Sequence, residues 1–329
     1  EICACLVGSE MCIRDRKNMA QSVDGLYLNK YVDPQLLIER RNYRADFMQV
    51  LGSVPAGALA ADGVRRNKLI NNVGFRVNNT EDFEPKQMTG KNYIVPWEIY
   101  DTEPSSCTDD EIRYLAFDKR AAIRVKHNEA FQVGIRNHVL HKLAPEDDSN
   151  EEMPVIRTTG EKDINGRLRL SYKDLVDFAT LAKTWNLPVT DALYMVLSPL
   201  HMGDLLLDKD ASKYFYDRTF YLDPATGKPK GFMGIKFFEN NDCPFYNAET
   251  AKKVAEGTKP SAETDFQAST FFYAPNTYYH IESVKSLYRP ETTDTRSKSP
   301  TSEYRTQTYG IVDRIEDFGV GAILSGKSV

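Results

Sequence analysis

The sequence lacks any long apolar run, since no stretch approaches the roughly 18 to 20 residues that a membrane-spanning helix needs. It also lacks a basic tail, because 42 Lys and Arg stand against 47 Asp and Glu, which gives a net charge of −5. Proteins that hold nucleic acid by neutralising its phosphates depend on clustered Lys and Arg. The sequence therefore argues against a membrane protein and against a protein that binds nucleic acid by neutralising its phosphates.

Cysteine is scarce once the first sixteen residues are set aside. The stretch EICACLVGSEMCIRDR opens without Met, holds three of the five Cys, and has neither helical nor strand periodicity. Its last twelve letters resemble a string that recurs at the ends of metagenome-derived sequences where sequencing-adapter DNA has been translated, so we interpret 1–16 as an artefact rather than a disordered arm. Cys107 and Cys243 then remain, too few for a disulfide framework or a four-ligand zinc site. A reducing cytoplasm is the natural setting.

Signatures of catalysis are missing as well. There is no phosphate-binding GxxxxGK[ST], no GxGxxG, no HExxH and no GxSxG. His138 and His141 form an HxxH without a nearby carboxylate or Cys cluster, so a helix-dipole role is favoured over metal binding. Cys107 has no local base, and the acidic stretch 146–152 lacks the spacing of a calcium loop. We predict no catalytic residue, no metal site and no cofactor.

The clearest element present is one long helix, predicted from Asp109 to Ala144. The sequence Thr108-Asp109-Asp110-Glu111 is a capping box, and apolar residues recur behind it at helical spacing until Pro145. At roughly 1.5 Å per residue such a helix is about 54 Å long. The mean helix of a globular domain has only about 11 to 12 residues, so this helix indicates an elongated molecule.

An extended β excursion is predicted before the helix, from 57 to 100. The stretch is rich in Gly and Asn, with short β-prone pieces at 73–77 and 93–99, and it is too long for a plain surface loop. It contains the basic group Arg65-Arg66-Asn67-Lys68 and, further along, the acidic residues Glu81, Asp82 and Glu84. These opposite charges predict a self-complementary contact between copies, with a merely solvated face as the alternative.

Shorter elements are predicted in the rest of the chain. Helices are expected at 34–51, at 172–185 behind a Ser171 cap, and at 199–207 behind Ser198. Strands are expected at 155–158, 193–197, 235–238, 271–273 and 278–281. The last two β segments are predicted at 304–315 and 319–324, joined at Glu316-Asp317.

In this order the pieces resemble the major capsid proteins of tailed bacteriophages, which have the Hong Kong 97-type fold. The resemblance includes FDKRAAIRVKHNEAFQ in the long helix, and the strings LYMVLSPLHMGDLL, GFMGIKFFENN, EYRTQTYGIVDRI and GVGAILSG after it. The last two strings are similar to those of phages that infect gut Bacteroidetes. The resemblance implies an α+β chain with an N-terminal arm (17–56), an extended β-hairpin loop (57–100), a spine helix with the start of a peripheral domain (101–171), an axial domain (172–280) and a return to the peripheral domain (281–329). It also implies that the last two β segments pair with each other in the peripheral domain.

A function in shell building is implied by the same resemblance. Many copies, as pentamers and hexamers, would form the icosahedral head around double-stranded DNA, together with portal and scaffolding or decoration proteins. The chain would be a virion component assembled in the host bacterial cytoplasm, with no enzyme activity and no membrane partner. A cleaved scaffolding segment and a self-crosslinking Lys-Asn pair are not matched. The candidate subunit contacts are Arg65, Arg66, Lys68, Glu81, Asp82, Glu84, Lys86 and Lys91.

Two alternatives remain open at this point. An encapsulin-like nanocompartment shares the fold and would need a cargo-binding surface. A cytoplasmic α+β enzyme with a scattered site of Tyr, His and carboxylates would instead show one compact pocket. It would also have a short loop in place of Asp62 to Pro96.

Overall fold

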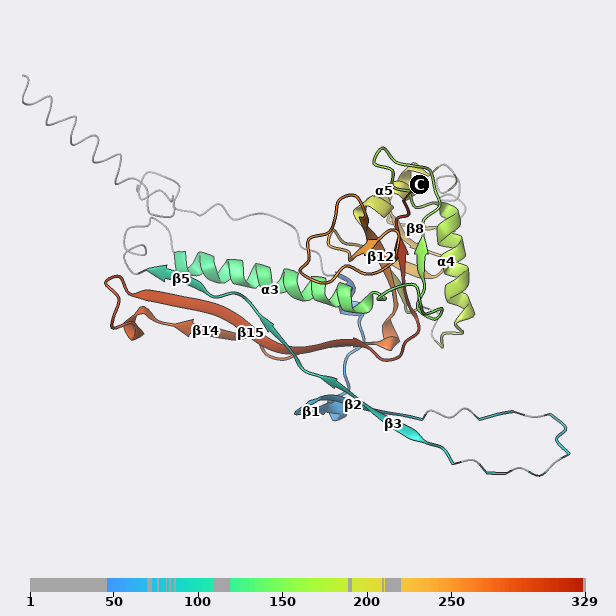
Figure 1. Ribbon diagram of the computed structural model, residues 1–329, viewed down its shortest axis with the longest axis horizontal. Helices are drawn as coiled ribbons and strands as arrows, with labels where there is room; N and C mark the ends of the chain where they lie inside the picture. The colour runs from blue at the N-terminus through green and yellow to red at the C-terminus, as the bar shows by residue number, and fades with distance from the viewer. Residues whose placement is uncertain are drawn as a thin grey trace, which may run out of the picture. The chain divides into compact units, whose positions relative to one another are not determined.

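The structure is a computed structural model of the chain (Figure 1). It describes residues 46–69, 73–75, 77–80, 82, 84–85, 87–108, 119–188, 191–208, 210 and 220–327. The chain divides into two compact units. The first includes Ile99–Gly134 and Ser283–Thr308, and the second consists of Arg44–Glu98, Ile135–Glu282 and Tyr309–Val329.

An eight-stranded mixed sheet is the centre of the second unit. Its strand order is β6-β16-β12-β7-β10-β9-β8, and β11 pairs with β12 beside this path. β7 and β10 are parallel, with Leu193 opposite Ile235, whereas β12 runs antiparallel to both of its neighbours. The strands are β6 (Val155–Arg157), β7 (Leu193–Leu197), β8 (Phe220–Leu222), β9 (Pro229–Phe232), β10 (Ile235–Glu239), β11 (Phe245–Asn247), β12 (Asp265–Tyr273) and β16 (Val320–Leu324).

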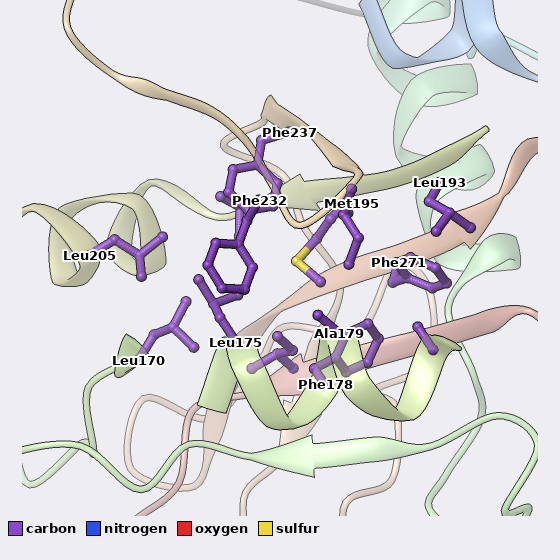
Figure 2. Close-up of a cluster of buried hydrophobic side chains, with 14 of the residues drawn as sticks. Leu170, Leu175, Phe178, Ala179, Leu193, Met195, Leu205, Phe232, Phe237 and Phe271 are labelled. Carbon is purple, nitrogen blue, oxygen red and sulfur yellow. The ribbon is translucent and has the colours of Figure 1, made fainter. Parts of the chain in front are cut away.

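Helices α4 (Tyr172–Thr184) and α5 (Pro199–Leu207) contribute to the main core on one face of this sheet. Figure 2 shows Phe178 of α4 among side chains from the strands, and its ring centroid lies 5.1 Å from that of Phe271 in an edge-on arrangement. Met195 and Phe232 are also completely buried in this cluster. Fully burying a side chain of this size stabilises the fold by about 1.5 to 3 kcal/mol, so the sheet and both helices form one core.

Local sequence signals account for the starts of both helices. Ser171 accepts a hydrogen bond from the Asp174 amide, and the Asp174 carboxylate accepts one from the Ser171 amide, which completes a capping box. The Ser198 hydroxyl accepts from the His201 amide, and Pro199 occupies the first helical position. The predicted starts of these two helices are confirmed.

The long helix α3 is described from Lys119 to Leu143. Its predicted end is confirmed to within one residue, whereas residues 109–118, including Glu111 of the predicted capping box, lie outside the described residues. The Lys253 ammonium caps the C-terminus of α3. It donates hydrogen bonds to the carbonyl oxygens of His141 at 2.8 Å and Ala144 at 3.0 Å. It also pairs with Glu146 at 2.7 Å. Lys253 thus satisfies carbonyls that a helix end leaves without partners.

Strand β15 (Thr301–Arg314) organises a five-stranded sheet. In the first unit it pairs with β14 (Lys285–Arg289) and β5 (Ser105–Thr108), and in the second with β13 (Thr277–Ile281). β4 (Glu98–Asp101) is its remaining partner. The short 3-10 helices are η1 (Asp46–Val50), η2 (Ala56–Ala58), η3 (Ala274–Asn276) and η4 (Glu291–Thr293).

The predicted pairing of the last two β segments is wrong, although both strands exist. β16 lies between β6 and β12 in the eight-stranded sheet instead of beside β15. All five of its residues are buried, as expected of a strand covered on both faces. The Asn276 side chain holds the bend between β15 and β16, donating to the carbonyls of Glu316 and Phe318 and accepting from the Glu316 amide.

Two further sequence predictions need adjustment. Residues 73–75 and 77, the described part of the predicted β segment 73–77, do not form a strand. The second hairpin strand, β3, begins at Gly90, three residues before the predicted start at 93. Of the helix predicted at 34–51, residues 34–45 lie outside the described residues, and Asp46–Val50 is a 3-10 helix with Phe47 buried. Within the described parts of the chain, no helix is both long and apolar enough to cross a membrane.

Candidate subunit-contact arm

A β-hairpin excursion, residues 59–96 and here called the arm, forms the candidate contact site. It consists of β1 (Leu59–Ala60), β2 (Gly63–Leu69) and β3 (Gly90–Pro96), all antiparallel (Figure 1). The pairing runs from Gly63 opposite Pro96 to Leu69 opposite Gly90. Gly63 has φ +144°, and a Cβ there would lie 2.0 Å from the Val95 carbonyl oxygen. Glycine is therefore required where the arm begins.

The base of the arm packs within the second unit, to which the arm belongs. Val64 is fully buried and clusters with Val54 and Ile311. The Trp97 indole nitrogen donates to the Ala60 carbonyl at 3.0 Å, and its ring lies 5.8 Å from that of His280. This small core fixes where the arm starts, but it covers none of the arm beyond its first residues.

Beyond the base, large apolar side chains on the arm are open to solvent. Val73, Phe75 and Val77 are 83%, 89% and 72% exposed, and Leu69 and Ile94 are also exposed. A two-stranded ribbon with both faces in water is marginal on its own, and a contiguous apolar surface marks an interaction site. The composition of the arm therefore suits a segment that another chain covers.

Two of the predicted contact residues have partners within their own chain. Arg66 donates from Nη1 to the Ile315 carbonyl at 2.6 Å, and its guanidinium lies 5.2 Å from the centre of the Tyr278 ring. The Lys68 ammonium is 3.1 Å from the Glu316 carboxylate. Both side chains thus reach the β15–β16 bend and hold the arm to its base. Sequence spacing carries no signal for this, because the partners lie about 250 positions away.

Four of the remaining predicted contact residues, Arg65, Asp82, Glu84 and Lys91, are exposed. Arg65 forms a double hydrogen bond with Asp62, which lowers the pKa of that carboxyl group. Lys91 lies opposite Lys68 in the hairpin and places its ammonium 5.0 Å from the centre of the Tyr93 ring. Asp82 and Glu84 are exposed, whereas Glu81 and Lys86 lie outside the described residues. Among the described residues, no ion pair joins Arg65, Arg66 or Lys68 to Asp82 or Glu84.

We expect Arg66→Leu to loosen the base of the arm. A hydrogen bond from a charged donor is worth at least about 1.5 kcal/mol, so amides of residues 64–66 should exchange about tenfold faster, measured by hydrogen exchange and mass spectrometry. Arg65→Leu is the control, since Arg65 contacts only its neighbour Asp62 among the described residues. Equal exchange in the two variants would contradict the anchoring role of Arg66.

The two histidines of the HxxH do not converge on a shared ligand position. His138 has a carboxylate at each ring nitrogen, Glu98 at 2.7 Å and Glu256 at 2.8 Å. His141 instead contacts the Val254 carbonyl through Nε2 at 2.9 Å. No group of three or more His, Cys, Asp or Glu in the described part of the chain is arranged to hold a metal ion. Sequence reasoning missed both carboxylate partners, which are remote along the chain.

A buried polar network was also missed. Arg167 forms a bidentate pair with Asp204, and His201 contacts Ser269 and Ser325 at 2.7 and 2.8 Å. Burial lowers the pKa of His201 to about 4, so the ring is neutral near pH 7. Although serine and histidine are in contact, both are fully enclosed and no substrate reaches them. The network joins α5 to the sheet and has no catalytic geometry.

The enzyme alternative predicted a single compact pocket and a short loop at 62–96. That segment forms the arm instead. Cavities in the second unit include two of comparable size, about 330 Å³ beside Ser171 and Asp208 and about 300 Å³ beside Phe237 and Lys228. Neither cavity is lined by a histidine, whereas the enzyme alternative expects Tyr, His and carboxylates at one site.

Comparisons with known proteins identify the fold. No protein-family model matches the sequence, and no curated protein is significantly similar to it. Solved structures match the chain over most of its length. The capsid of Cyanophage P-SCSP1u matches with a TM-score of 0.62 at 10% identity, covering 94% of this chain and 98% of the phage chain. The capsid of Ralstonia phage GP4 covers the same shares, with a TM-score of 0.58 at 11% identity.

A third structure agrees with these two. The Cyanophage Pam1 capsid matches with a TM-score of 0.60 at 10% identity, covering 82% of this chain and 86% of the phage chain. Identities this low show the fold alone. The predicted α+β architecture, with a long helix and mixed sheets in the Hong Kong 97-type arrangement, is confirmed.

Proposed function

We propose that this chain is a major capsid protein, which assembles with many copies of itself into the icosahedral head shell of a tailed phage. One observation carries the proposal: an arm whose apolar residues are up to 89% exposed, on a fold shared over 94% of the chain with a phage capsid protein. Covering such an arm with another chain would remove its apolar surface from water, which is favourable.

The form of assembly follows from the asymmetry of this contact. We infer that the surface that accepts Val73 and Phe75 of the arm is a different face of the neighbouring copy. Contacts between unlike faces are heterologous, and they produce rings when the rotation closes. Pentamers and hexamers of this kind are the building blocks that we propose. The exposed contact residues are Arg65, Asp82, Glu84 and Lys91, with Glu81 and Lys86 as further candidates from the sequence.

We assign the domains as the resemblance implies, with one extension. The axial domain at 172–280 supplies most strands of the eight-stranded sheet, but β6 and β16 belong to the same sheet. We therefore include these two strands with the axial domain. The extended β-hairpin loop at 57–100, which contains the arm, and the spine helix keep their assignments, and residues 17–56 form the proposed N-terminal arm.

The proposed partners follow from the proposed role. A portal and scaffolding or decoration proteins would complete the head, and double-stranded DNA would be enclosed without sequence preference. The net charge of −5 suits a container whose DNA is confined rather than bound by clustered cations. The proposed location is the virion, after assembly in the bacterial cytoplasm, and no catalytic step is involved. A host among gut Bacteroidetes remains a prediction.

Electron microscopy of the purified chain tests the proposal. We expect closed shells or capsomer rings, alone or with a co-expressed scaffolding protein, and sedimentation faster than that of a monomer. A monomer at high concentration under all these conditions would contradict it. Shells that select an enzyme as cargo would instead identify the nanocompartment alternative.

A further inference from the structure

His138 lies between two carboxylates at the end of α3. Its Nε2 is 2.7 Å from the Glu98 carboxylate, and its Nδ1 is 2.8 Å from that of Glu256. The imidazole is mostly enclosed, with 17% of the side chain exposed. Both distances are those of hydrogen bonds between charged groups.

The protonation state of the ring decides whether both contacts are favourable. Ionised carboxylates only accept hydrogen bonds, and a neutral imidazole has a single N–H to donate. Only the imidazolium donates to Glu98 and Glu256 at once. Burial by itself lowers the pKa of His138, but the hydrogen bonds to the two carboxylates outweigh it and raise the pKa above 6.5. The charged form is thus the one that fits the site.

Other charged groups face this cluster from each neighbouring element. Lys142, one turn further along α3, contacts the second oxygen of Glu98 at 2.8 Å. Asp313 of β15 is half-buried, and burial raises its pKa on balance, although the Arg314 amide, the Arg314 guanidinium and Lys142 oppose this. Arg314 pairs with Asp317, and Lys253 with Glu146. Lys142 stays protonated near neutral pH because Glu98 raises its pKa, so His138 is the group whose charge changes there.

The position of the cluster links it to the arm. Glu98 is the first residue of β4 and follows the last residue of β3, Pro96, after Trp97 alone. Glu256 lies in the turn beside Gly257. The three side chains therefore tie the root of the arm and a surface turn to the end of α3. We call Glu98, His138 and Glu256 the clasp.

We propose that the clasp is a proton-dependent lock on the root of the arm: it holds when His138 is an imidazolium and opens when the ring is neutral. A neutral ring donates to only one of the two carboxylates, and the positive charge that attracted both of them is lost. The consequence for shell building rests on the proposed function, because the arm matters to assembly only if neighbouring copies bind it.

The direction of the pH effect follows from the raised pKa. The folded chain binds the proton on His138 more tightly than the unfolded chain does, so the clasp contributes its full stabilisation below about pH 6.5, the ordinary value for histidine. The contribution declines as pH rises above 6.5 and is lost once the pH exceeds the raised pKa of His138. We therefore expect the root of the arm to be locally more stable in mild acid and less stable in mild alkali.

Two measurements on the full chain test the clasp. In NMR spectra of chain labelled with nitrogen-15 at histidine, His138 should titrate above pH 6.5 with both ring nitrogens protonated below that point. In hydrogen exchange corrected for the intrinsic effect of pH, protection of residues 95–98 and 254–257 should fall about tenfold across the same titration. His138→Gln should abolish that pH dependence. The matched control is His141→Gln, on the same helix but in contact with a backbone carbonyl, which should keep it.

The possible results separate the clasp from the proposed function. The clasp would be contradicted if His138 titrates at or below pH 6.5. It would also be contradicted if the hydrogen-exchange protection of residues 95–98 does not change as His138 titrates. The wild-type titration decides this even if the Gln variant fails to fold. If the clasp behaves as expected but the chain never assembles, the clasp is supported and the capsid role is contradicted. Assembly that follows the same titration supports both.

Discussion

Replacing Asp204 by Ala is expected to lower the free energy of unfolding by about 3 to 5 kcal/mol, the cost of leaving one charge of a buried pair without its partner. The Asp204 carboxylate accepts from both terminal nitrogens of Arg167, at 2.6 and 2.7 Å, and from the Leu170 amide at 3.1 Å. The Arg167 and Asp204 side chains are 6% and 4% exposed. Truncation therefore leaves a cation and an amide buried with too few acceptors.

Urea unfolding of the unassembled chain, followed by circular dichroism, measures this loss. The double variant Arg167→Met with Asp204→Leu should recover most of it, because apolar residues of similar size remove both charges together. Asp62→Ala is the surface control. It breaks an exposed pair with Arg65 and should leave the unfolding midpoint unchanged. A loss below about 1 kcal/mol for Asp204→Ala would mean that water reaches Arg167.

Placing charges at the end of the arm is expected to abolish shell formation without changing the stability of the isolated chain. Phe75 and Val77 are 89% and 72% exposed, so Phe75→Asp with Val77→Asp removes almost no packing within the chain. In an assembled shell the same positions would be covered, and burying an unpaired carboxylate is strongly unfavourable. Sedimentation through a sucrose gradient should show at least a tenfold loss of shells.

The matched control for the arm is Ile164→Asp. Ile164 is 97% exposed and lies in a loop of the second unit outside the arm. This variant should assemble as the unchanged chain does, and both variants should unfold at the same urea concentration. Normal shells from the arm variant would remove the arm end from the interface. Loss of shells in both variants would point to a general effect of added charge.

Local elements of this fold could be predicted from the sequence because their causes are local. Ser171 and Asp174 are three positions apart, and Ser198 directly precedes Pro199, so both helix starts are determined by adjacent residues. The long helix was recognisable for the same reason, since its apolar spacing continues until Pro145. The exposure of the arm was also predictable, because a segment rich in Gly and Asn has few apolar side chains with which to form a core of its own.

The interactions that position the arm could not be predicted in this way. Arg66 binds a carbonyl 249 positions away, and Glu98 reaches His138 across 40 positions. In the sequence, the basic group at 65–68 has no nearby partner and indicates an exposed surface. In the structure, Arg66 and Lys68, two of its three cations, contact Ile315 and Glu316 in the bend after β15. The partner of β16 was missed because a buried, continuous apolar strand has no alternation to indicate which neighbour it pairs with.

The central place of β16 has a consequence for synthesis of the chain on the ribosome. β16 pairs with β6 on one side and β12 on the other, yet it is translated after every other strand of that sheet. Until Val320–Leu324 has emerged, β6 and β12 present unpaired edges, which are templates for aggregation. A nascent chain interrupted before residue 320 therefore cannot join β6 to the rest of the sheet. We expect such a fragment to aggregate through these edges instead of folding.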